Sequence, residues 1–173
     1  TSICLGKTIR FSGAYNLQHL WNTGEQTSSI VTDTTGDYIL ISTNSYGCYG
    51  SDTVKLTVIE PFAEQLAVAT FSETSHAIIL AWERSRDKGI VSYDLMRETN
   101  VANKYETIVT KTFSDESYFI DTNANSLMRS YRYQLKTIDN CGNFALSVPH
   151  KTIHLQATLN LDGYANLSWS KYE

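Results

Sequence analysis

The stretch DYILISTNSYGCYGSDTVKLTV, residues 37–58, decides the fold class, because apolar and polar side chains alternate along it with a period of two. In its first half, Tyr38 and Leu40 fall on one side, and Ile39 and Ile41 fall on the other. Successive side chains of a β-strand point to opposite faces of the sheet, so this pattern predicts a strand. The second half, TVKLTV, alternates in the same way, and the glycine-containing turn between the halves predicts two neighbouring strands.

The same period of two recurs along the rest of the chain. Alternating runs lie at residues 8–11, 37–43, 53–58, 77–83, 92–98, 131–137 and 151–159. Turn residues separate these runs, and we find no apolar stripe at helical spacing over three turns. Many short strands at regular spacing are typical of sandwiches and barrels. We therefore predict an all-β fold of two tandem immunoglobulin-like β-sandwich domains.

Two features divide the chain into parts. Pro61 cannot donate to a strand ladder, so it ends the strand that precedes it. The sequence around Trp82 then recurs around Trp169, at a spacing of 169 − 82 = 87 residues. We therefore expect a domain at residues 1–59, a second at 60–154, and the first strands of a further repeat at 155–173.

Composition limits the functions that the chain can have. The net charge of −4 at pH 7 argues against nucleic acid as a partner, because phosphate binding needs an excess of Lys and Arg. All apolar runs are much shorter than the ~18 residues of a membrane span. No targeting segment is visible, and the opening TSICLGKTIRF reads as the middle of a longer protein. We expect a fragment that is anchored through other regions of that protein.

The cysteines allow three interpretations. Cys48 as a nucleophile would need a base, and none of the four histidines stands in a recognisable setting for one. A zinc site would need clustered ligands, and no such spacing occurs. A disulfide between Cys4 and Cys48 fits better, because a small domain needs a covalent staple and these segments could lie side by side. It would imply an oxidising compartment and leave Cys141 either free or bonded to another part of the full protein, whereas three reduced thiols would imply the cytosol.

Residues 1–59 resemble the PKD/immunoglobulin-like modules of proteins secreted by Bacteroidetes. The resemblance rests on CLGKTIRFSG, LWNTGEQT and TTGDYILISTNSYGCYGSDTVKLTV. It implies that Trp21 and Tyr38 are core residues and that Cys4 pairs with Cys48.

The segment from Pro61 to about His154 resembles a fibronectin type III domain. The resemblance rests on Trp82, on YDLMRE and on LMRSYRYQLKTIDNCGN. It implies that Trp82 is a core residue, and that Leu127 and Tyr133 form a tyrosine corner in which the Tyr133 hydroxyl bonds to backbone. Both modules together are similar to surface proteins of the gliding-motility-associated type.

Few residues are candidates for a functional site. Tyr46 and Tyr49 flank Cys48 near a loop tip, where exposed rings could stack on sugars or on partner side chains. The Asp-Thr pairs at Asp33 and Asp52 match the acceptor pattern of an O-glycan that exported proteins of this group carry, a pattern that turns also favour. The carboxylates form no convincing catalytic pair or calcium loop.

The sequence therefore predicts no enzyme, no cofactor and no metal. We expect a spacer or adhesion module of a larger secreted or cell-surface bacterial protein, bound to an unknown protein or glycan. A carbohydrate-binding accessory region of a larger secreted hydrolase is the alternative. Two strands alone are marginal in water, so residues 155–173 predict a strand-exchange dimer of this fragment.

Overall fold

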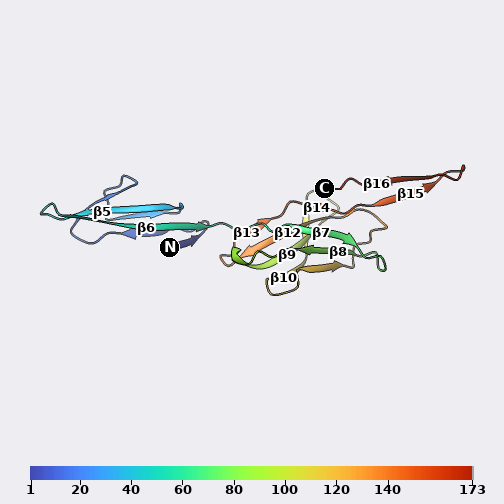
Figure 1. Ribbon diagram of the computed structural model, residues 1–173, viewed down its shortest axis with the longest axis horizontal. Coiled ribbons are helices and arrows are strands. Elements are labelled where there is room, and N and C mark those ends of the chain that lie inside the picture. The colour runs from blue at the N-terminus through green and yellow to red at the C-terminus, as the bar shows by residue number, and fades with distance from the viewer. Residues whose placement is uncertain (173) are drawn as a thin grey trace. The chain divides into compact units, whose positions relative to one another are not determined.

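The computed structural model describes residues 1–172, and it divides the chain into two compact units, Thr1–Glu60 and Pro61–Glu173. Strands make up the regular structure of both units (Figure 1). Within the described residues, the helical content is one short 3-10 turn at Arg86–Lys88. The predicted all-β fold class is confirmed.

The first unit is a sandwich of two sheets. Its strands are β1 (Ser2–Cys4), β2 (Ile9–Ser12), β3 (Gln18–Trp21), β4 (Ser29–Thr32), β5 (Gly36–Thr43) and β6 (Tyr49–Ile59). One sheet has the order β1-β6-β5-β3, and the other consists of β2 and β4. β1 runs parallel to β6, and the other pairs are antiparallel. Two such sheets that enclose one core form an immunoglobulin-like sandwich.

The core of the first unit contains Trp21, Ile30, Tyr38 and Leu56. The indole N–H of Trp21 donates to the carbonyl of Thr27 at 2.9 Å. The hydroxyl of Tyr38 donates to the carbonyl of Thr34 at 2.8 Å, just before β5 begins. Both large rings are therefore buried without leaving their polar atoms unpaired, which burial would otherwise penalise.

The second unit contains a larger sandwich. Its strands are β7 (Leu66–Phe71), β8 (Ile78–Trp82), β9 (Ile90–Glu98), β10 (Tyr105–Thr112), β11 (Tyr118–Asp121), β12 (Arg132–Asp139), β13 (Phe144–Leu146) and β14 (His150–Lys151). One sheet has the order β11-β8-β7, and the other has the order β10-β9-β12-β13, with β14 also paired to β12. Two such sheets around one core again form an immunoglobulin-like sandwich.

Alternation along the strands builds the core of this sandwich. Every second residue of β12 is buried, from Tyr133 to Asp139. Trp82 and Tyr93 meet across the two sheets, with ring centroids 5.5 Å apart. Leu80 and Leu135 are fully or almost fully buried in the same cluster. The period of two that the sequence shows therefore places every second side chain of these strands in the core.

A buried ion pair joins the two sheets of this unit. Arg97 of β9 donates to both carboxylate oxygens of Asp121 of β11, at 2.9 and 3.2 Å. The hydroxyl of Tyr133 of β12 donates to the same carboxylate at 2.9 Å, and the amide of Asn123 donates at 3.1 Å. Burial raises the pKa of Tyr133, and the charge of Asp121 raises it further. Burial opposes the charge of Arg97, but Asp121 outweighs it, so the pKa of Arg97 is raised.

The predicted tyrosine corner of this unit is wrong in two respects. Leu127 is 63% exposed, so it is not a core residue. Its segment turns back on itself, because the amide of Leu127 donates to the side-chain oxygen of Asn125. The hydroxyl of Tyr133 binds a carboxylate, and it is the hydroxyl of Tyr131 that accepts a backbone N–H, from Asn125 at 3.1 Å.

A hairpin follows the second sandwich along the chain. β15 (Leu155–Leu159) and β16 (Ala165–Trp169) are antiparallel and pair with each other in a two-stranded sheet of their own (Figure 1). Every residue of both strands is exposed. At the base of the hairpin, His154 and Ser170 exchange two hydrogen bonds, and a ring nitrogen of His154 lies 2.8 Å from the carbonyl of Ser126.

Two buried tyrosines should respond differently to loss of the hydroxyl. Tyr133→Phe removes a hydrogen bond to a charged group and should lower the free energy of unfolding by about 1.5–3 kcal/mol. Tyr93→Phe removes a buried hydroxyl that has no hydrogen-bond partner among the described residues, and it should leave stability unchanged or raise it by about 1 kcal/mol. Urea unfolding followed by tryptophan fluorescence compares the two. Equal losses would show that the bond to Asp121 contributes nothing.

Stability should also fall steeply in alkali. Burial, and then the charge of Glu64, raise the pKa of Tyr93 to about 12, against about 10 in an unfolded chain. The stability that depends on the neutral phenol is therefore fully present below pH 10 and is lost as the pH rises from 10 to 12. Unfolding measured between pH 8 and 12 should show this loss, and Tyr93→Phe should make it shallower. An unchanged slope in that variant would contradict the assignment.

Candidate functional site

The loop that joins β5 to β6 is held in place by hydrogen bonds within the loop itself. The side-chain oxygen of Asn44 accepts the amides of Tyr46 and Cys48, at 2.9 and 3.0 Å. The amide of Asn44 donates to the carbonyl of Cys48, and Gly47 has a φ of +80° that favours glycine. The loop therefore holds Tyr46 at its tip, where the ring is 90% exposed.

The register of β3, β5 and β6 places apolar side chains on the solvent side of their sheet. Leu20 pairs with Ile41, so these two side chains share a face. Tyr49 of β6 pairs with Thr43, two residues beyond Ile41, so its ring stands on the same face. The opposite face carries the core residues of the unit. The outer face is defined by Leu20, Ile39, Ile41 and Tyr49, which are 44%, 37%, 39% and 79% exposed.

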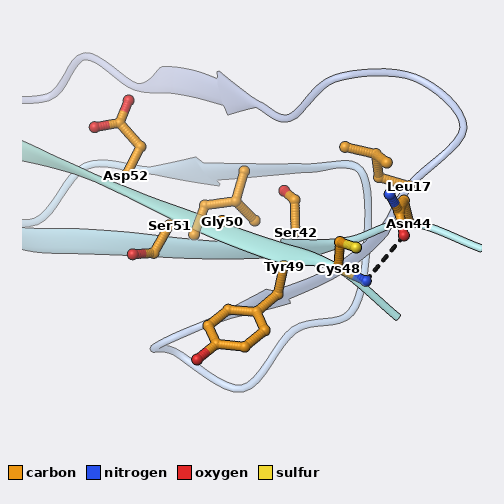
Figure 2. A pocket seen from close by; sticks show the side chains of 9 residues that line it. Leu17, Ser42, Asn44, Cys48, Tyr49, Gly50, Ser51 and Asp52 are labelled. Atoms are coloured by element: carbon orange, nitrogen blue, oxygen red, sulfur yellow. Dashed lines mark hydrogen bonds between the residues drawn. The ribbon is translucent and has the colours of Figure 1, made fainter. Parts of the chain in front are cut away.

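An open hollow of about 430 Å³ lies beside the loop (Figure 2). Leu17 and Leu40 supply apolar side chains, and Ser42, Asn44 and Asp52 supply polar ones. Figure 2 shows the ring of Tyr49 directed away from Ser42 and Asp52. Tyr49 also lines this hollow, so the residue contributes to its wall while its ring points away from Ser42 and Asp52.

The structure separates the two tyrosines that the sequence singled out. Tyr46 stands at the loop tip, whereas Tyr49 continues the outer face of the sheet. Sequence reasoning overlooked Leu20 as a member of the outer face, because the register of β3 against β5 is not visible in a single strand. The alternation of Ile39 and Ile41 was visible, and it was the signal that could have located this face.

The predicted disulfide between Cys4 and Cys48 is wrong. Cys4 and Cys141 are disulfide-bonded, and Cys48 is an exposed free thiol. β1 runs parallel to β6 with Cys4 opposite Ile59, whereas Cys48 precedes the other end of β6. The 59 − 48 = 11 residues between these ends span about 36 Å of strand, far beyond the ~6 Å between the Cα atoms of a disulfide.

The disulfide therefore joins Cys4 to Cys141, the cysteine that the sequence left without a partner. Cys141 lies in the turn between β12 and β13. One carboxylate oxygen of Asp139 accepts the amides of Cys141 and Asn143, at 2.9 and 2.8 Å, and so fixes this turn. The order of cysteines along the sequence carries no information about this pairing.

Across residues 1–172, no group of three or more His, Cys, Asp or Glu side chains could hold a metal ion. Within that same range, no helix is long and apolar enough to cross a membrane. Thr34 and Thr53, which follow Asp33 and Asp52, are exposed.

No family model matches the chain, and no curated protein matches its sequence. Among solved structures, the chain is similar to a Fn3-like protein from Clostridium thermocellum, at 24% identity and a TM-score of 0.42, over 51% of this chain and 88% of that one. It is similar to the FN1–FN3 domains of chicken CNTN1, at 9% identity and a TM-score of 0.42, over 87% of this chain and 61% of that one. A chain of a cytokine receptor complex has 10% identity and a TM-score of 0.38, over 86% and 92%.

The thiols provide a direct test of the cysteine assignment. One thiol per chain should react with Ellman's reagent in the folded oxidised protein, and Cys48→Ser should abolish this reaction. Proteolysis without reduction should yield a linked pair of peptides that contain Cys4 and Cys141. A linked peptide that contains Cys48 would contradict the assignment.

Proposed function

We propose that this chain is a spacer and adhesion segment of a larger exported bacterial protein, secreted or held at the cell surface through other regions. Fn3/Ig-like sandwiches are generally non-catalytic modules. The disulfide supports export, because disulfides persist in oxidising compartments and are rare in the cytosol. The assignment of the first unit as a PKD/immunoglobulin-like module is part of this proposal.

The main support for an adhesion role is the outer face of the first unit. Four apolar side chains are exposed on one side of one sheet, and contiguous exposed apolar surface marks sites of interaction. Tyr49 supplies a ring with an apolar face and a polar tip, a residue type that is enriched at binding surfaces. The partner is a protein or glycan at the cell surface rather than a nucleic acid, because the chain carries a net charge of −4.

A carbohydrate-binding accessory role is the second candidate. Tyr46 and Tyr49 are 90% and 79% exposed, and exposed rings of this kind can stack on sugars. Their separation distinguishes the two roles. A glycan that stacks on the loop tip needs Tyr46, whereas a protein that covers the outer face needs Ile41.

Binding to glycan arrays and to whole cells should separate these candidates. We expect Tyr49→Ala and Ile41→Lys to reduce cell binding at least about tenfold, the factor that corresponds to 1.4 kcal/mol. Tyr15→Ala removes a ring that is 94% exposed and does not belong to the outer face, so it is the matched control. Glycan binding that is lost in Tyr46→Ala and kept in Ile41→Lys would favour the accessory role. Equal binding by all variants would refute both.

A further inference from the structure

The hairpin β15–β16 repeats the pairing of the hairpin β7–β8. Leu155 pairs with Trp169, as Leu66 pairs with Trp82. The tryptophans are 87 residues apart and the leucines 155 − 66 = 89. One residue of the difference is the register shift after Leu66, and the other is the shorter loop, 160–164 against 72–77. The two hairpins thus share a register as well as a sequence pattern.

The side chains of β15–β16 are sorted completely between the two faces. Residues directly opposite each other share a face, so the register divides the hairpin into an apolar side and a polar side. The apolar side consists of Leu155, Ala157, Leu159, Ala165, Leu167 and Trp169. The polar side consists of Gln156, Thr158, Asn166 and Ser168. A hairpin with this pattern is made to cover a core with one face and to meet water with the other.

The apolar side has no cover within the described residues. Leu155, Leu167 and Trp169 are 59%, 57% and 68% exposed. At the spacing of 87, Leu167 and Trp169 correspond to Leu80 and Trp82, which are 0% and 3% exposed. The corresponding leucine and tryptophan side chains are therefore buried in the core at β7–β8 and exposed to solvent at β15–β16.

The strands that pack against β7–β8 indicate the kind of sheet that would pack against β15–β16. Leu80 and Trp82 pack in one cluster with Tyr93 and Leu95 of β9 and with Tyr133 and Leu135 of β12. These strands form the opposite sheet of the sandwich. A sheet of the same kind, with alternating large apolar side chains, is the complement that the register of β15–β16 fits.

A second copy of the hairpin fits less well. Strands of five residues are ~17 Å long, and two of them at ~4.8 Å spacing offer a face of a few hundred Å² at most. Stable association of proteins needs about 800 Å² from each partner. The area that two hairpins bury when they pack face to face is well below this value. Completion of a sandwich, in contrast, surrounds the same side chains with a full core.

We propose that β15–β16 is the first hairpin of a further fibronectin type III-like sandwich, and that a sheet with the alternating apolar side chains of β9 and β12 covers its apolar side. The bonds between His154 and Ser170 fix the base of the hairpin and so help to hold its two strands in register. This inference rests on the proposed role as a segment of a tandem array.

An extended chain tests the proposal with strands that are known to fit such a hairpin. A copy of residues 87–154 is placed directly after Glu173, which keeps the spacing of 87 residues. Hydrogen exchange of the amides of β15 and β16 should then be slowed about a hundredfold or more relative to the 173-residue chain. The emission of Trp169, obtained by difference from Trp169→Phe, should shift to shorter wavelength.

Two variants of the extended chain place a carboxylate on either face of the hairpin. Leu167→Asp should abolish the added protection, and Ser168→Asp should keep it. Equal behaviour of these variants, or no added protection in the parent, would overturn the proposal. So would a dimer, seen by sedimentation in both the short and the extended chain and lost in Leu167→Asp, because strand exchange with a second copy would then cover this face. Cell binding measured with Tyr49→Ala reports on the adhesion role separately.

Discussion

The carboxylate of Asp121 is the constraint on which the second sandwich depends. It lies at the end of β11, in one sheet, and binds Arg97 and Tyr133 of the other. A buried charge is costly unless it is paired and hydrogen-bonded, so an arrangement of the two sheets that separated these three groups would leave the carboxylate of Asp121 unpaired at a cost in stability. The network therefore selects one relative placement of the sheets, while the apolar cluster around it provides most of the burial.

Much of this fold could be predicted from the sequence, because the strand period is a local property. The alternation in residues 37–43 and 131–137 is sufficient to place Tyr38 and Tyr133 in the core. The partners of their polar atoms were less accessible. Tyr131 and Tyr133 both stand at alternate positions of one strand, and only the path of residues 122–131 decides which hydroxyl meets backbone and which meets Asp121.

The candidate site shows the same limit. Tyr49 could be selected from the sequence as an exposed aromatic residue, but Leu20, which lies on the same face of the sheet, comes from β3, whose register against β5 is a tertiary property. The cysteines show the limit most clearly. A parallel pairing of β1 with β6 places Cys4 at the far end of β6 from Cys48, and strand direction cannot be inferred from the spacing of two cysteines.

The length of β6 has a consequence for solubility. Within the described residues, β1 pairs with this strand only from Thr57 to Ile59, and the amino group of Thr1 donates to the carbonyl of Lys55 at 3.0 Å. The edge from Tyr49 to Val54 is therefore open to pairing with another chain. Exposed edges of this kind are templates for aggregation unless the sequence resists it. Asp52 and Lys55 put opposite charges at that edge, and the carboxylate of Asp52 already accepts the amide of Thr53 at 2.8 Å. A strand that approached this edge would have to break that bond and desolvate a charge. Both costs oppose edge-to-edge pairing between copies of the first unit, the step by which fibres grow.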